Sequence, residues 1–123
     1  LSRRQRQMCI RDSIDAGGGI TSAISKLREK VGHMTKIEVE TRSLDELREA
    51  LAAGADIIML DNMTIEQMAE AVKITGGKAL LEASGNIAAD TIQAVAATGV
   101  DIISIGALTH SVKAFDISMK ISL

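Results

Sequence analysis

Short β-branched runs alternate with amphipathic stretches along most of this chain, and each amphipathic stretch ends on a glycine. The apolar runs at 56–60, 78–82 and 101–105 begin at nearly even intervals of about 22 residues. An interval of that length holds one strand, one helix and two tight loops, so the alternation predicts a β/α architecture. Because the runs are apolar on both faces, we expect parallel strands that helices cover.

Helix starts can be located by their capping residues. Ser43 and Thr64 each precede a helical pattern, and Glu46 and Gln67 stand three residues further on. Both pairs therefore predict capping boxes, in which the first side chain accepts from the third helical N–H and the other reaches back. Gly54 follows the first of these helices and suits a left-handed cap.

Other segments extend the same pattern. The run KIEVE at 36–40 predicts a strand, and apolar residues at helical spacing predict helices over 20–31 and around 92–96. Strict alternation of apolar and polar residues over 115–123 predicts an extended, strand-like tail. Residues 1–13 show neither period, so we expect the strand that should precede 20–31 to be absent or overwritten.

The first thirteen residues also differ from the rest in composition. They hold four arginines and begin with Leu, which suggests a non-native leader outside the folded domain of 14–123. From Ile14 onward there are ten Lys/Arg and fifteen Asp/Glu, so this body is acidic and nucleic-acid binding is not indicated. No apolar run approaches the roughly 18 to 20 residues that span a bilayer, so we expect a cytoplasmic protein without a membrane partner.

In parallel β/α architectures, ligands bind at the carboxyl ends of the strands. Three of the predicted strands finish in carboxylates, namely Glu40, Asp61 and Glu82. Any one of them could simply cap the next helix. Because Ser43 and Thr64 already serve as caps, Glu40 and Asp61 are available to bind a metal ion or ligand hydroxyls. Glu82 ranks below them, since it could point inward with a structural role.

Small residues follow the last two predicted strands of the series. One segment is Ser84-Gly85-Asn86, and the other begins at Gly106 and reaches His110. A glycine after a strand often marks only a turn, but two such loops on neighbouring strands favour a phosphate site built from backbone N–H groups. His110 could donate to that phosphate or carry a proton.

These segments resemble a known family. IEVE followed by SLDEL, then ADIIMLDNM, ALLEASGN and TGVDIISIGALTHSVKAFDIS, resemble quinolinate phosphoribosyltransferases across roughly residues 14–123. The resemblance implies an α/β fold, a partial, open, parallel α/β barrel of the TIM-barrel type. It also implies that the chain holds only the C-terminal β/α units, that a separate N-terminal domain precedes them, and that the full-length enzyme is a homodimer or higher homo-oligomer.

The resemblance further implies an activity and a site. The family transfers the phosphoribosyl group of phosphoribosyl pyrophosphate to quinolinate with decarboxylation, giving nicotinate mononucleotide for NAD biosynthesis. Glu40 and Asp61 resemble the carboxylates that hold the ribose hydroxyls and the Mg²⁺-bound pyrophosphate side. The expected 5′-phosphate site resembles two loops with a nearby histidine, here Ser84, Gly85, Asn86, Gly106 and His110.

One departure limits what this chain should do alone. The family carries a Lys-Asp-Asn-His-Ile stretch where Arg11-Asp12-Ser13-Ile14 stands here, so few basic groups are expected near the substrate carboxylates. We therefore expect the isolated chain to be inactive. Two other readings stay open: a molybdenum-transport-associated paralogue of the same family, or a non-catalytic β/α-barrel remnant.

Overall fold

The computed structural model describes residues 7–11, 18–105 and 117–120. Within these ranges six strands form one sheet in chain order, and neighbours from the first to the fifth run parallel. The last strand is antiparallel to the fifth. The strands are β1 Gln7–Ile10, β2 Lys36–Thr41, β3 Ile57–Asp61, β4 Leu80–Ser84, β5 Ile102–Ile105 and β6 Ile117–Lys120.

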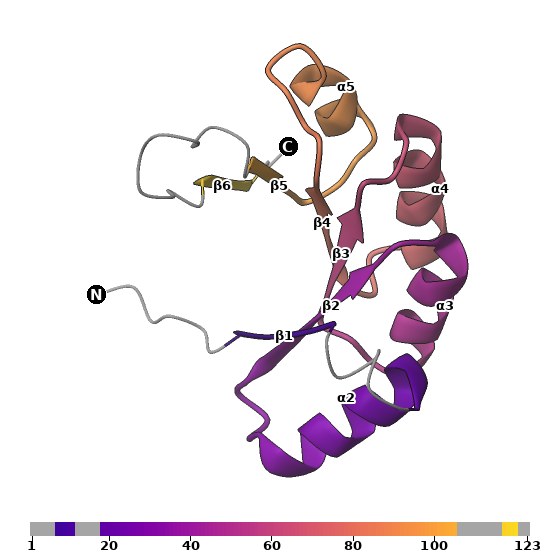
Figure 1. The fold of residues 1–123 in the computed structure, drawn as a ribbon, viewed down its shortest axis with the longest axis vertical. Coiled ribbons are helices and arrows are strands. Elements are labelled where there is room, and N and C mark those ends of the chain that lie inside the picture. The colour runs from indigo at the N-terminus through magenta and orange to yellow at the C-terminus, as the bar shows by residue number, and fades with distance from the viewer. Residues whose placement is uncertain (1–6, 12–17, 106–116, 121–123) are drawn as a thin grey trace.

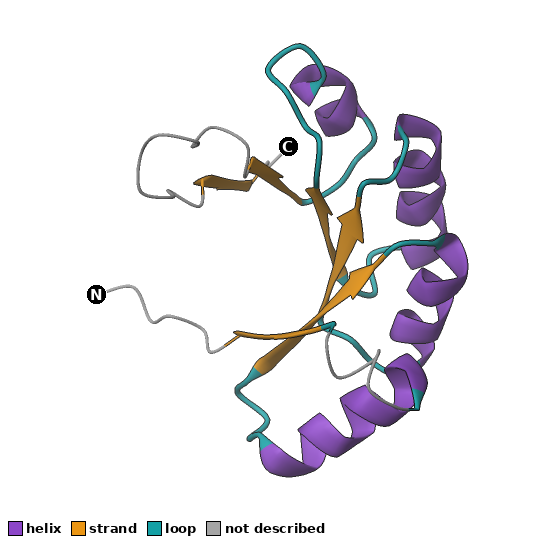
Figure 2. Cartoon of the chain, in the orientation of Figure 1, coloured by secondary structure: helices purple, strands orange, loops and turns teal. Residues whose placement is uncertain are grey.

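The helices of the described segments follow one another along the outer side of this sheet (Figure 1). They are α2 Gly19–Lys30, α3 Leu44–Ala52, α4 Ile65–Thr75 and α5 Ile92–Ala97. Figure 2 shows the sheet curving away from them, with β1 and β6 at the two ends of the arc. The predicted α/β class, a partial and open parallel barrel, is therefore confirmed.

The hydrophobic core lies between the helices and the convex face of the sheet. Along β2 the side chains of Ile37, Val39 and Thr41 are fully buried, and Ile58 and Leu60 continue this layer in β3. Since successive strand residues point to opposite faces, the intervening residues line the concave face. In β2 these are Glu38 and Glu40, so along this strand the concave face is acidic.

The repeated sequence GADII/GVDII has a structural role at the other end of the strands. Asp56 Oδ2 accepts from the Ile37 N–H at 2.9 Å, and Asp101 Oδ2 accepts from the Leu81 N–H at 2.8 Å. Each aspartate thus fixes the start of one strand to the preceding strand. Although burial acts in the opposite direction, that N–H and the nearby Arg28 hold the pKa of Asp56 below its usual range.

The expectation that the strand before the first helix is absent or overwritten is wrong in its first part. Gln7–Ile10 forms β1 and pairs with β2, with Met8 opposite Ile37. Parallel pairing uses backbone N–H and C=O groups, so an extended segment can pair without an alternating apolar pattern. Whether residues 1–13 are native concerns their origin, and it stays a prediction.

The two predicted capping boxes differ in outcome. At α4 the box is complete, since Gln67 N–H donates to Thr64 Oγ1 and Thr64 N–H donates to Gln67 Oε1. At α3 the Glu46 N–H donates to Ser43 Oγ at 3.2 Å, but the Glu46 carboxylate accepts from the Arg42 N–H at 2.7 Å. The predicted box at Ser43 is therefore half right, because the Glu46 carboxylate bonds the Arg42 N–H and not the Ser43 N–H.

Candidate functional site

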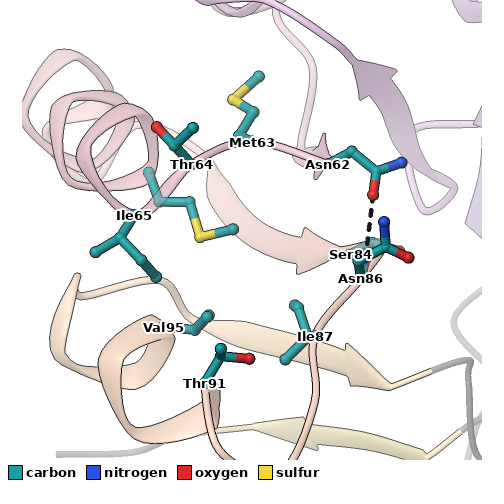
Figure 3. Close-up of a pocket in the computed structure, with 10 residues that line it drawn as sticks. Asn62, Met63, Thr64, Ile65, Ser84, Asn86, Ile87, Thr91 and Val95 are labelled. Atoms are coloured by element: carbon teal, nitrogen blue, oxygen red, sulfur yellow. Dashed lines mark hydrogen bonds between the residues drawn. The ribbon is translucent and has the colours of Figure 1, made fainter.

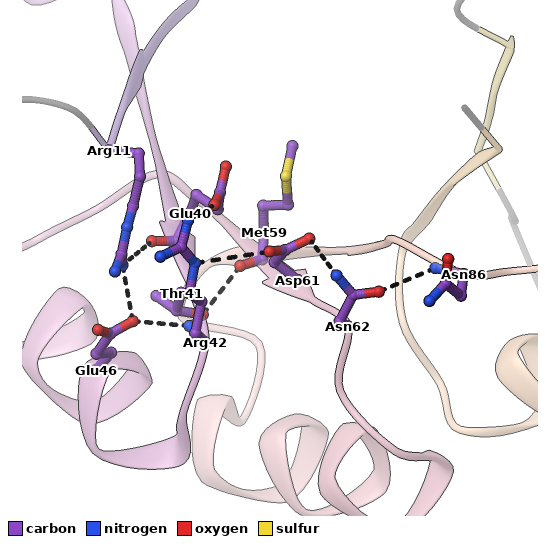
Figure 4. A network of polar contacts seen from close by, with 9 residues as sticks. All are labelled: Arg11, Glu40, Thr41, Arg42, Glu46, Met59, Asp61, Asn62 and Asn86. Atoms are coloured by element: carbon purple, nitrogen blue, oxygen red, sulfur yellow. Dashed lines mark hydrogen bonds and ion pairs between the residues drawn. The ribbon is translucent and has the colours of Figure 1, made fainter. Parts of the chain in front are cut away.

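The two predicted carboxylates lie at the carboxyl edge of the sheet and share one cation (Figure 4). Arg42 Nη2 lies 3.3 Å from Glu40 Oε1, and Arg42 Nε lies 3.7 Å from Asp61 Oδ2. Like charges brought together need such a partner. Arg42 was not among the predicted site residues, because its position between strand and helix cap gives no sign that its side chain turns back.

The strand register places Asp61 nearer the carboxyl edge than Glu40. Glu40 pairs with Met59, and Met59 pairs with Glu82, so these three residues form one row. Asp61 pairs with Ser84 in a row further along. The carboxylate of Asp61 thus stands beside the predicted phosphate loop, one step beyond Glu40.

A second arginine approaches the same region from β1. Arg11 Nη1 donates to the Glu40 carbonyl oxygen at 3.4 Å and to Glu46 Oε2 at 3.0 Å. The Arg11 side chain is mostly buried. Within the described residues two guanidinium groups, those of Arg11 and Arg42, therefore contact acidic side chains or backbone at this edge, and the expectation of few basic groups near the substrate carboxylates stays a prediction.

Glu82 behaves as the structural residue that the sequence suggested. It is buried on the concave face, hydrogen-bonded to Glu38, and it also accepts from Ser104 Oγ. Burial, followed by the hydrogen bond to Glu82 and repulsion from Glu82 and Glu40, raises the pKa of Glu38 to about 8. Glu38 therefore keeps a proton at neutral pH and can donate to Glu82.

The predicted phosphate loop is tied to the end of β3. The Asn62 N–H donates to the Ser84 carbonyl oxygen at 3.0 Å, and the Asn86 N–H donates to Asn62 Oδ1 at 3.1 Å. Ser84 closes β4, and Gly85 follows with a φ of 111°, in the region that favours glycine. The loop therefore has a defined shape, in which the Asn86 N–H already has an acceptor.

A pocket of about 280 Å³ lies on the helix side of this loop, between α4 and α5 (Figure 3). Asn62, Ser84 and Asn86 line one end of it. Apolar side chains, including Ile65 and Val95, line the remainder. The polar end of the pocket coincides with the predicted phosphate loop.

The structure thus brings five of the seven predicted site residues to one edge of the sheet: Glu40, Asp61, Ser84, Gly85 and Asn86. Gly106 and His110 lie outside the described residues. No group of three or more His, Cys, Asp or Glu side chains in the described segments is arranged to hold a metal ion. In the same ranges, no helix has both the length and the apolar character to cross a bilayer.

Comparisons with known proteins agree with this geometry. The family model described as "Quinolinate phosphoribosyl transferase, C-terminal domain" matches residues 5–120. A Bacillus subtilis protein named "Probable nicotinate-nucleotide pyrophosphorylase [carboxylating]" is 47% identical over 110 residues, covering 89% of this chain and 38% of that protein. A Methanocaldococcus jannaschii protein of the same name is 48% identical over 119 residues, covering 91% and 42%.

A solved structure gives the same result. The nicotinate-nucleotide pyrophosphorylase from Francisella tularensis superposes with a TM-score of 0.78 at 43% identity, covering 94% of this chain and 41% of that one. A curved parallel sheet with helices along one face defines a domain of the β/α-barrel class. The chain belongs to the quinolinate phosphoribosyltransferase family and corresponds to its C-terminal domain. It spans 38% to 42% of the length of these three relatives.

Proposed function

We propose that the protein containing this chain transfers the phosphoribosyl group of phosphoribosyl pyrophosphate to quinolinate and releases carbon dioxide, giving nicotinate mononucleotide. The observation that carries the proposal is the meeting of Glu40 and Asp61 at the same sheet edge as the 84–86 loop. Carboxylates suit sugar hydroxyls and developing positive charge, whereas a small-residue loop suits a phosphate. The names of the relatives support the carboxylating reaction over that of a transport-associated paralogue.

The reaction divides the work between these two groups. The quinolinate nitrogen forms a bond to the anomeric carbon as the bond to pyrophosphate breaks, and a proton later replaces the departing carboxyl group. Glu40 and Asp61 would accept from the ribose hydroxyls and stabilise the oxocarbenium-like transition state. The loop from Ser84 to Asn86 would anchor the 5′-phosphate and so fix the position of the anomeric carbon.

Arg42 stands where the ribose would bind, between the two carboxylates. Its side chain is 54% exposed, so it can leave without opening the core. Ribose hydroxyls would then take over the contacts that the guanidinium makes with Glu40 and Asp61. Because the freed guanidinium stays close, it could pair with a substrate carboxylate or with pyrophosphate.

Magnesium is proposed as the cofactor, carried by phosphoribosyl pyrophosphate. Two carboxylates bridged by an arginine are too few ligands for a site made of protein alone, but they fit an ion whose other ligands are substrate oxygens. When bound, Mg²⁺ would neutralise charge on the pyrophosphate leaving group. Glu40 and Asp61 are the described residues that would face it.

Assembly and cell compartment are further proposals. The resemblance that suggests this reaction also suggests a homodimer or higher homo-oligomer. A cytoplasmic location is proposed for this protein, although plant relatives are named as chloroplastic or mitochondrial, so family membership alone does not fix the compartment. Quinolinate and phosphoribosyl pyrophosphate would be its small-molecule partners.

Calorimetric titration of the chain with phosphoribosyl pyrophosphate and Mg²⁺ tests the proposal. We expect weak binding by the unmodified chain, and a further loss of about tenfold in Glu40→Gln and in Asp61→Asn, because each loses a charged acceptor. Asp45→Asn is the matched control, since that carboxylate is 95% exposed and pairs only with Arg48 among the described residues. Equal affinity in Asp61→Asn and Asp45→Asn would contradict the assigned role.

A further inference from the structure

Asn62 has an unusual backbone conformation for its residue type. Its φ is 52°, and it is the one non-glycine residue with a positive φ in the described part of the chain. Asparagine tolerates this left-handed region better than most residues, because its short polar side chain can bond locally. The conformation turns the chain directly after Asp61, so that the next backbone and side-chain groups face the neighbouring loop.

Three hydrogen bonds use this turn. Asn62 N–H donates to the Ser84 carbonyl oxygen at 3.0 Å, and Asn62 Oδ1 accepts from the Asn86 N–H at 3.1 Å. On its other side, Asn62 Nδ2 donates to Asp61 Oδ1 at 3.4 Å. Figure 4 shows the side chain between Asp61 and Asn86, with one contact to each.

The loop is also shaped to receive this side chain. A Cβ atom built on Gly85 would lie 2.3 Å from Asn62 Oδ1 and 2.9 Å from Asn62 N, closer than real Cβ atoms come. Asn62 thus occupies the space beside Gly85 that any other residue would need. The fit is mutual, because the amide requires a glycine and the glycine leaves room for the amide.

We propose that Asn62 is a positioning residue, which holds the 84–86 loop at a fixed place relative to the Asp61 carboxylate. The inference rests on the proposed function, in which Asp61 contacts ribose hydroxyls and the loop contacts the 5′-phosphate. These two ligand groups belong to one sugar phosphate, so the spacing of their binding groups decides how well both are held at once. Asn62 sets that spacing without contacting the reacting atoms.

Two substitutions of Asn62 distinguish the contribution of its backbone conformation from that of its side chain. Asn62→Gly keeps the left-handed turn and the N–H that bonds Ser84, but it removes the contacts to Asn86 and Asp61. Asn62→Asp keeps an acceptor for the Asn86 N–H, but it replaces the donor to Asp61 with a second negative charge. Thr64→Ala is the control, because it removes the nearby helix cap and lowers stability without touching the loop.

The measurements are amide hydrogen exchange at Asn86 and titration of the ¹⁵N-labelled full chain with inorganic phosphate and with phosphoribosyl pyrophosphate plus Mg²⁺. In Asn62→Gly we expect Asn86 exchange to rise and affinity for both ligands to fall, each by about five- to tenfold, because the hydrogen bond that holds the Asn86 N–H is lost. In Asn62→Asp, Asn86 protection and inorganic phosphate affinity should stay near the unmodified values. Its affinity for phosphoribosyl pyrophosphate should fall. Thr64→Ala should change neither exchange at Asn86 nor affinity.

The possible results distinguish a failure of the positioning role of Asn62 from a failure of the proposed function. Unchanged Asn86 protection in Asn62→Gly, or lost protection with unchanged affinity, would overturn the positioning role while leaving the proposed function in place. Failure of the unmodified chain to bind either ligand would overturn the proposed function, and the inference with it. An equal loss of protection and affinity in Thr64→Ala would reduce Asn62 to a general stabiliser and also overturn the inference.

Discussion

Glu38 shows how burial on the concave face changes the protonation of a single side chain. The residue is 3% exposed, and its side chain is hydrogen-bonded to Glu82, two strands away in β4. Two carboxyl groups in contact cannot both be ionised without a large cost, so they share a proton. Because that proton is held only in the folded chain, stability must depend on pH.

The pH dependence has a defined sign. Folding raises the pKa of Glu38 from 4.5 to about 8, so below pH 4.5 the group is protonated in both states. Between these values the unfolded chain releases the proton and the folded chain keeps it. The free energy of unfolding should therefore fall as pH rises through this range, by at most about 1.4 kcal/mol per pH unit for one proton.

Glu38→Gln should remove this dependence, because glutamine resembles the protonated acid and can still donate to Glu82. We expect urea denaturation between pH 5 and 8 to show a flatter profile for the variant, and higher stability than the unmodified chain near pH 8. Asp45→Asn, at an exposed site, should retain the original slope. Parallel profiles for Glu38→Gln and the unmodified chain would show that the proton is held elsewhere.

At the residue scale, sequence patterns could locate some members of the site and not others. The position of Glu40 and Asp61 at the carboxyl edge could be predicted, because the ends of parallel strands follow from the apolar runs and meet at one edge. Asn62 and Arg42 could not, since their roles depend on a backbone angle and on a side-chain direction. The adjacent Gly85 was a partial signal, because its need for space implied a close neighbour.

At the scale of elements, helices and strands were largely predictable from the period of their apolar residues. The helix α4 shows why: its complete capping box and its left-handed Gly76 are local features that the sequence specifies directly. Strand β1 could not be predicted, because its place depends on the exposed backbone edge of β2. The apolar pattern of a segment gives no information about pairing with a neighbouring strand that lies far away in the sequence.

The strand starts provide a prediction at this scale. Asp56 and Asp101 make equivalent bonds to the preceding strand, but Asp56 also pairs with Arg28 at 2.6 Å and has Lys36 at 4.0 Å. Asp56→Ala should therefore lower the free energy of unfolding by about 2 kcal/mol, and Asp101→Ala by about 1 kcal/mol. Because the pKa of Asp56 is lowered on folding, its extra contribution should be present at neutral pH and be lost as pH falls through that pKa.

Thermal denaturation at pH 7 and at acid pH would measure the loss of stability in each variant and its dependence on pH. Arg28→Ala in the Asp101→Ala background is the matched control, since it removes the cation while the Asp56 bond to Ile37 N–H stays. Equal losses for Asp56→Ala and Asp101→Ala at pH 7 would show that the Arg28 pair contributes nothing beyond the shared backbone bond. In that case the two repeated aspartates, Asp56 and Asp101, would stabilise the fold only through their hydrogen bonds to the preceding strand.

At the scale of the whole molecule, the sheet of the described residues is an open arc (Figure 1). By strand register, Glu40 and Asp61 of the candidate site lie on its concave face. Helices cover the convex face, whereas Leu80, on the concave face of β4, is 41% exposed. The chain spans 38% to 42% of the length of the three relatives compared above. In the proposed function, this edge of the sheet would supply the ribose and phosphate contacts.

This arrangement predicts that the chain alone forms no nicotinate mononucleotide. Quinolinate brings two carboxylates, which need several basic groups once water is excluded. In the described part of the site two guanidinium groups are near, and Arg11 is held by Glu46, so at most Arg42 is left for the two substrate carboxylates. A steady-state assay of product formation should stay at background, with the Bacillus subtilis relative as the positive control. Turnover above background by the 123-residue chain would show that the described edge of the sheet, with Arg42, is enough to hold both substrate carboxylates.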